Sequence, residues 1–125
     1  MDNRQEINLI GGGFQHTNSS TDNSDTVYIK WLKNSNIAPI SIYVDYGIMT
    51  NVVDKSKKNY GWLSESKTII GNCYDYCKNN VEKLKNLFIT IFTHDVDLAN
   101  YSKFFTLIQC GVKSTIKQPF IYEKK

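Results

Sequence analysis

Arginine and proline are scarce in this chain of 125 residues, and each scarcity argues against a class of protein. Arg4 is the only arginine, so lysine carries nearly all of the positive charge behind a net charge of +3. Lysine lacks the planar guanidinium with which arginine makes its paired contacts to phosphate and guanine, so we expect no nucleic-acid partner. The lysines at 55, 57 and 58 are expected to be a solvated surface. Two prolines and 41% hydrophobic residues indicate a globular chain rather than a disordered one.

Cysteine is also sparse, and its spacing fits no metal site. Cys73 and Cys77 lie four residues apart, without the two-residue spacing or the histidine pair of a structural zinc site, and Cys110 makes the count odd. We therefore predict buried free thiols, with no metal and no cofactor. The amino-terminal MDNRQE has no apolar signal core, and no segment reaches membrane-spanning length. These features predict a cytosolic protein, in a cell or an infected host, without a membrane partner.

The stretch from 59 to 95 predicts a strand, an amphipathic helix and a second strand. Tyr60–Leu63 is a short apolar run, and Leu87–Phe92 is apolar without alternation, as in a strand covered on both faces of a parallel sheet. Between them, apolar residues recur at helical spacing after a plausible N-cap at Asn72. We expect one continuous helix there. A strand, a crossover helix and a parallel strand form a right-handed unit.

The rest of the chain predicts further strands of the same sheet. Thr26–Leu32 fits either a short helix or a strand, and Val96–Tyr101 fits one helical turn or a loop. The remaining apolar segments are expected strands at Glu6–Ile10, Ile40–Asp45 and Phe104–Ile108, followed by an extended exit at Pro119–Tyr122. The pattern predicts a single α/β domain over 1–125 with a mainly parallel sheet.

Polar residues follow the two central strands, and they are the best functional clue. Ser64-Glu65-Ser66 and Thr93-His94-Asp95 both begin where a predicted strand ends. In open parallel sheets, ligands bind beyond the carboxyl ends of the strands. Glu65 there is either a general base for a hydroxyl or a capping carboxylate bonded to nearby amides.

Three weaker candidates accompany Glu65. His94 is either a hydroxyl ligand or a structural side chain, and Asp95 either contacts a ligand or caps the segment 96–101. His16 belongs to a polar loop after Gly11-Gly12-Gly13, and a loop at a strand end can line a cleft. Asp45, at another strand end, is a weaker case of the same kind.

Several segments resemble a known family. INLIGGGF near the start, YGWLSES at 60–66, IFTHDVDL at 91–98 and KQPFIYEKK at 117–125 resemble the amino-terminal half of family 10 fucosyltransferase-like glycosyltransferases, in the form carried by marine phages and bacteria. In that family an aromatic-ended strand runs into a small residue, a glutamate and a small polar residue. Ser64-Glu65-Ser66 matches this step, and the resemblance implies that Glu65 is the general base.

The resemblance implies a Rossmann-like domain, the acceptor-side half of a two-domain GT-B enzyme. The donor-binding half would begin where this sequence ends, so we expect the chain alone to transfer no sugar. A second chain could supply the missing half through the 117–125 tail. The alternative is a non-catalytic binding or structural module derived from such a domain, for example a viral, virion-associated or accessory protein.

Overall fold

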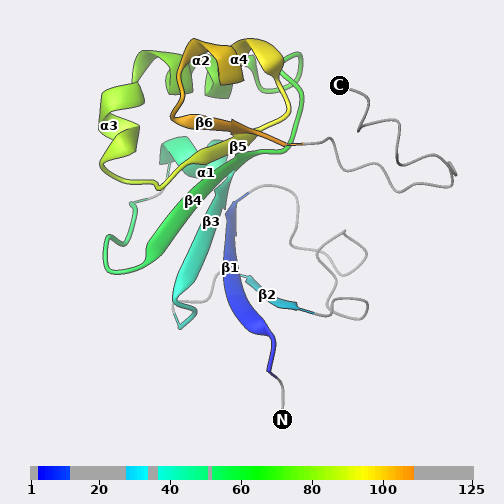
Figure 1. Cartoon of the computed structure of the whole chain (residues 1–125), viewed down its shortest axis with the longest axis vertical. Coiled ribbons are helices and arrows are strands. Elements are labelled where there is room, and N and C mark those ends of the chain that lie inside the picture. Colours follow the sequence, from blue (N-terminus) through cyan, green and yellow to red (C-terminus); the bar gives the residue numbers. More distant parts are fainter. Residues whose placement is uncertain (1–2, 12–27, 34–36, 51, 109–125) are drawn as a thin grey trace, which may run out of the picture.

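The computed structural model describes residues 3–11, 28–33, 37–50 and 52–108 (Figure 1). Six strands form one sheet in the order β2-β1-β3-β4-β5-β6, and every pairing between them is parallel. The strands are β1 (Gln5–Gly11), β2 (Ile29–Lys33), β3 (Ile40–Val44), β4 (Lys58–Leu63), β5 (Ile91–Thr93) and β6 (Phe105–Leu107). The predicted α/β class with a mainly parallel sheet is confirmed, and the ambiguous segment at Thr26–Leu32 contributes a strand, β2.

Four helices accompany the sheet in the described part of the chain, and those between residues 71 and 101 gather over its β4–β6 end in Figure 1. They are α1 (Tyr46–Thr50), α2 (Gly71–Asn79), α3 (Val81–Lys85) and α4 (Val96–Tyr101). The main buried cluster joins these helices to the sheet. Its members are Tyr43, Ile48, Leu63, Ile70, Cys73, Tyr74, Cys77, Leu84, Phe88, Ile91, Leu98 and Phe105. Tyr43 from β3 meets Phe88 edge to face, with ring centroids 5.4 Å apart.

The helix expected between the two central strands is divided in two. Asn80 separates α2 from α3, with backbone angles φ −131° and ψ 31° that are not helical. Its side-chain Nδ2–H donates to the carbonyl oxygen of Tyr76 at 2.8 Å, which satisfies a carbonyl at the end of α2. An asparagine amide competes in this way with helix propagation. Asn72 does not cap α2 either, because the N-cap position is Ile70 and Asn72 lies inside the helix.

The second central strand begins later than its apolar run predicts. The N–H groups of Leu87 and Phe88 donate to the carbonyl of Leu84, at 3.0 and 2.9 Å, so these residues complete the turn after α3. Ile89 and Thr90 make backbone hydrogen bonds to Asn59 and Gly61, and β5 proper starts at Ile91. The apolar run begins before Ile91 because Phe88 packs in the core from the turn that precedes the strand.

The strand order reverses direction between β1 and β3. β2 lies on one side of β1, whereas β3 to β6 extend from the other side. Such a reversal is a topological switch point, where the carboxyl ends of parallel strands leave a crevice for ligands. Asp45 follows β3 at this point, and Ser64 and His94 follow β4 and β5 at the same edge.

Candidate functional site

Asp45 is the centre of the hydrogen bonding at the carboxyl edge. Its side chain is buried, with the residue 4% exposed, and its backbone adopts φ 53°, which is rare for a residue other than glycine. The N–H and the hydroxyl of Ser64 donate to its two carboxylate oxygens at 2.7 and 2.6 Å. The N–H of Glu65 donates to Oδ1 at 3.3 Å. Asp45 therefore ties the end of β3 to the end of β4.

Glu65 has a fixed backbone and an exposed side chain. Its N–H donates to Asp45, and its carbonyl oxygen accepts a hydrogen bond from the Tyr74 hydroxyl at 2.9 Å. Burial raises the pKa of Tyr74 above its ordinary value of 10.0, so the phenol stays protonated and can donate. Within the described residues, no hydrogen bond or ion pair reaches the Glu65 carboxylate. The edge thus presents a carboxylate on a backbone that is held from both sides.

Asp95 and His94 lie at the same edge, one strand further along. Leu63 of β4 pairs with Thr93 of β5, so the residues that follow these two leave the sheet side by side. Asp95 is the N-cap of α4, because its Oδ2 accepts the N–H of Leu98 at 2.9 Å. This is the capping alternative that the sequence left open. His94 is partly exposed and makes no hydrogen bond with another described residue.

Lys67 connects the loop after β4 to α4. Its ammonium lies 3.5 Å from the Asp95 carboxylate and 3.7 Å from that of Asp97. Both ion pairs include an exposed partner, so each contributes little stability. They do hold the loop that carries Glu65 toward the start of α4. His16, the remaining candidate, lies outside the described residues.

Asp45 has more contacts at the carboxyl edge than the sequence predicted. Because it follows a predicted strand, the sequence indicated Asp45 as a site candidate, but a weaker one than Glu65. The sequence held one further signal, because aspartate is among the few residues that adopt a positive φ, and Tyr46-Gly47 follows it immediately. The partners of its carboxylate, at Ser64 and Glu65, are 19 and 20 residues away along the chain. No local pattern reveals that contact.

The two described cysteines are buried free thiols, as predicted, and neither is activated. Burial raises the pKa of Cys73 from 9.0 to about 11, with the negative charge of Asp45 adding to the effect. Burial raises the pKa of Cys77 to about 12, with Cys73 as a smaller cause. A thiol with a raised pKa is a poor nucleophile because little thiolate forms at neutral pH.

We expect Cys73 and Cys77 to resist Ellman's reagent at roughly pH 8 in the folded protein and to react fully in urea. A Cys110→Ser background leaves these two as the only thiols.

The raised pKa values also predict that the stability contributed by the two buried thiols is fully present below pH 9.0, the ordinary thiol pKa, and declines as the pH rises toward 11 and 12. Urea midpoints measured across this range check the slope. Rapid labelling of the folded Cys110→Ser protein would contradict both expectations.

The fold and the edge together define an α/β domain with a polar site beyond the carboxyl ends of its strands. No family model, curated protein or solved structure matches this chain. Among the described residues, no helix is long and apolar enough to cross a membrane. In the same part of the chain, no three His, Cys, Asp or Glu side chains are grouped so as to hold a metal ion.

Proposed function

We propose that this chain is the acceptor-binding, amino-terminal half of a sugar-transferring enzyme, with Glu65 as its general base. One observation carries the proposal: the Glu65 backbone is held by Asp45 and Tyr74 while its carboxylate stays exposed and unbonded within the described residues. A general base must be held in position and yet remain available to the proton it removes. The Glu65 carboxylate meets both conditions for an acceptor hydroxyl that binds above the carboxyl edge.

The capping roles at this edge belong to other carboxylates, which supports the assignment. Asp45 accepts the amides that follow β4, and Asp95 caps α4. The Glu65 backbone is hydrogen-bonded, but within the described residues its carboxylate caps no helix and accepts no amide N–H. In the same proposal His94 binds a second hydroxyl of the acceptor, and Asp95 contributes less because its oxygens face Leu98 and Lys67. His16 remains a proposed contributor from the loop after β1.

The donor sugar nucleotide requires residues beyond those of this site. We propose that a second chain or domain supplies them, docking through the 117–125 tail. The non-catalytic alternative, a binding or structural module derived from the same domain, keeps the acceptor site but uses no base. Sugar transfer in the presence of a donor-binding chain or domain would favour the enzyme, and binding without transfer would favour the non-catalytic module.

The proposed acceptor site predicts that neutral oligosaccharides bind at the carboxyl edge. In a ¹⁵N-edited titration, we expect amide shifts at Asp45, at 64–66 and at 94–95. Glu65→Ala should weaken this binding by about tenfold, the loss expected for one charge-assisted hydrogen bond. Its free energy of unfolding should change by less than about 0.5 kcal/mol, because the side chain is exposed.

Glu82→Ala is the matched control, because Glu82 is also an exposed glutamate but lies on α3. It should leave oligosaccharide binding unchanged. Equal weakening by the Glu65 and Glu82 variants, or no carbohydrate binding across a panel of neutral acceptors, would remove the basis for the acceptor site.

A further inference from the structure

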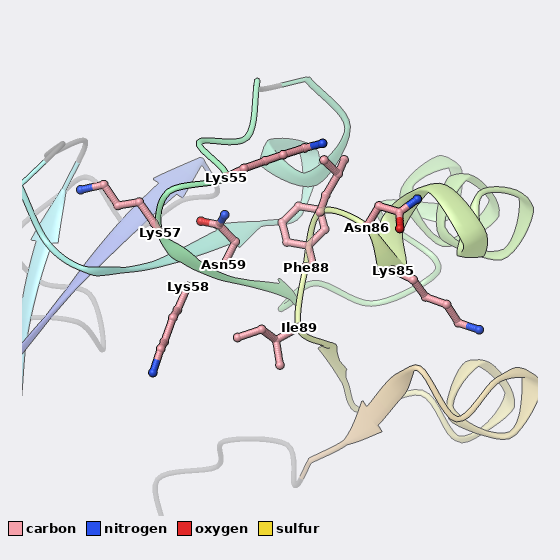
Figure 2. A pocket seen from close by; sticks show the side chains of 9 residues that line it. Lys55, Lys57, Lys58, Asn59, Lys85, Asn86, Phe88 and Ile89 are labelled. Carbon is pink, nitrogen blue, oxygen red and sulfur yellow. The ribbon is translucent and has the colours of Figure 1, made fainter.

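A hollow lies at the opposite edge of the sheet, near the amino ends of β4 and β5. It is bounded by the turn that leads into β4 and by the segment that joins α3 to β5 (Figure 2). Its volume is about 370 Å³, which lies within the range of small-molecule sites, roughly 300–1,000 Å³. The candidate base at Glu65 belongs to the other end of β4, so this hollow is separate from the acceptor site.

Four lysines surround the hollow and give it a positive potential. Lys57 donates to the carbonyl of Ala38 at 2.6 Å, and Lys85 pairs with Glu82 at 3.3 Å. The ammonium groups of Lys55 and Lys58 make no hydrogen bond or ion pair with another residue in the described part of the chain, and Lys58 is bonded there through its backbone N–H, to Pro39. In Figure 2 the four lysine side chains point outward in different directions, and Lys58 leaves β4 on the side opposite Asn59. The lysines therefore provide a positive field with movable donors, which suits an anion.

Asn59 lines the same hollow and has an unsatisfied acceptor. The residue is only 3% exposed, and its Nδ2–H donates to the carbonyl of Asp54 at 2.8 Å, which fixes the orientation of the amide. Its Oδ1 is buried and accepts no hydrogen bond. Buried polar atoms without a hydrogen-bond partner are uncommon in folded proteins, so we expect a donor to bind at Asn59 Oδ1. A ligand hydroxyl group or an ordered water can supply that donor.

The remaining walls favour a small ligand over a nucleic acid. Phe88 is the only aromatic residue in the lining, and it is 3% exposed, so it offers no face on which a base can stack. Ile89 is 56% exposed and gives an apolar surface, and the Asn86 side chain adds a second amide. Positive charge, amide groups and a limited apolar wall match a ligand that combines an anion with several hydroxyl groups.

We propose that this hollow binds a small phosphorylated polyol, such as a sugar phosphate. The phosphate lies beside Lys55, on the side of β4 that carries Asn59, with Lys58 and Lys85 adding to the positive field, and a ligand hydroxyl, or a water that the ligand holds in place, donates to Asn59 Oδ1. The inference does not depend on the proposed sugar transfer, because it rests on residues at the other edge of the sheet.

The test is a ¹⁵N-edited titration of the full chain at constant ionic strength with glucose 6-phosphate, inorganic phosphate and glucose. Glucose 6-phosphate should bind saturably, with amide shifts confined to 55–59 and 85–89. Phosphate should bind about tenfold more weakly or worse, and glucose should cause no shifts in these segments, because each lacks one of the two recognised groups. Equal binding of phosphate and glucose 6-phosphate would overturn the polyol assignment.

Paired lysine variants separate a site from general attraction to a basic protein. The Lys55→Ala, Lys58→Ala double variant should bind glucose 6-phosphate at least about tenfold more weakly. The Lys78→Ala, Lys103→Ala double variant loses the same charge from residues outside the hollow and should bind normally. Equal weakening in the two double variants, or tighter binding of a single-stranded oligonucleotide at 55–59 and 85–89, would overturn the proposal.

Discussion

Asp45→Ala is expected to lower the free energy of unfolding by about 3 kcal/mol. The substitution removes the acceptor for the Ser64 N–H, the Ser64 hydroxyl and the Glu65 N–H. Hydrogen bonds to a buried carboxylate contribute more than neutral ones, and donors left without an acceptor carry a desolvation cost. Alanine also tolerates the φ of 53° at this position less well than aspartate does. Urea denaturation of the wild type and the variant measures the difference.

Two matched substitutions identify which property of Asp45 matters. Asp45→Asn keeps one acceptor oxygen and the tolerance for positive φ, so its loss of stability should be clearly smaller than that of alanine. Asp54 accepts the N–H and the hydroxyl of Ser56 at 2.9 and 2.6 Å, which is the same local pattern on an exposed turn. Asp54→Ala should therefore be much milder than Asp45→Ala. Similar losses at Asp45 and Asp54 would show that burial does not strengthen the Asp45 contacts.

Strands β1, β3 and β4 were predictable because each carries a short apolar run with few competing interpretations. Glu6–Ile10 and Tyr60–Leu63 lie inside β1 and β4, and Ile40–Asp45 contains all of β3. The helix α1 was missed because Tyr46–Thr50 spans little more than one turn and contains Gly47, a poor helix former. Its stability comes from Ile48 in the core, a tertiary effect that periodicity over five residues does not reveal.

The edge of the sheet was predictable, but the division of roles along it was not. Ser64-Glu65-Ser66 and His94-Asp95 follow the paired strands β4 and β5, as the strand–helix–strand pattern required, whereas Thr93 is the last residue of β5. Which carboxylate would be buried depended on long-range contacts between β3 and β4. The partners of Asp45 and the contact of Tyr74 with the Glu65 carbonyl arise only when the sheet and α2 are assembled. The sequence therefore located the polar edge of the sheet and left its hydrogen bonding open.

The close approach of β1 to α1 positions the end of β3 beside the end of β1. Gly11 pairs with Val44 and adopts φ 83°. A Cβ built on Gly11 would lie 2.9 Å from Gly47 Cα and 3.0 Å from the Val44 carbonyl oxygen, both of them backbone atoms. Backbone atoms cannot rotate away as a side chain can, so any larger residue here must displace the chain just before Asp45.

Gly11→Ala is expected to cost about 3 kcal/mol or more, because the positive φ and the backbone overlap add to one another. Two other glycines provide a graded comparison in the same urea experiment. A Cβ on Gly61 would meet the side chains of Ile91 at 2.8 Å and Ile48 at 3.2 Å, which can adjust, so Gly61→Ala should cost less than Gly11→Ala. A Cβ on Gly71, in the first turn of α2, meets nothing within 4 Å, and Gly71→Ala should be neutral or stabilising by up to about 1 kcal/mol. If Gly11→Ala proves as mild as Gly71→Ala, the junction between β1 and α1 is looser than these distances require.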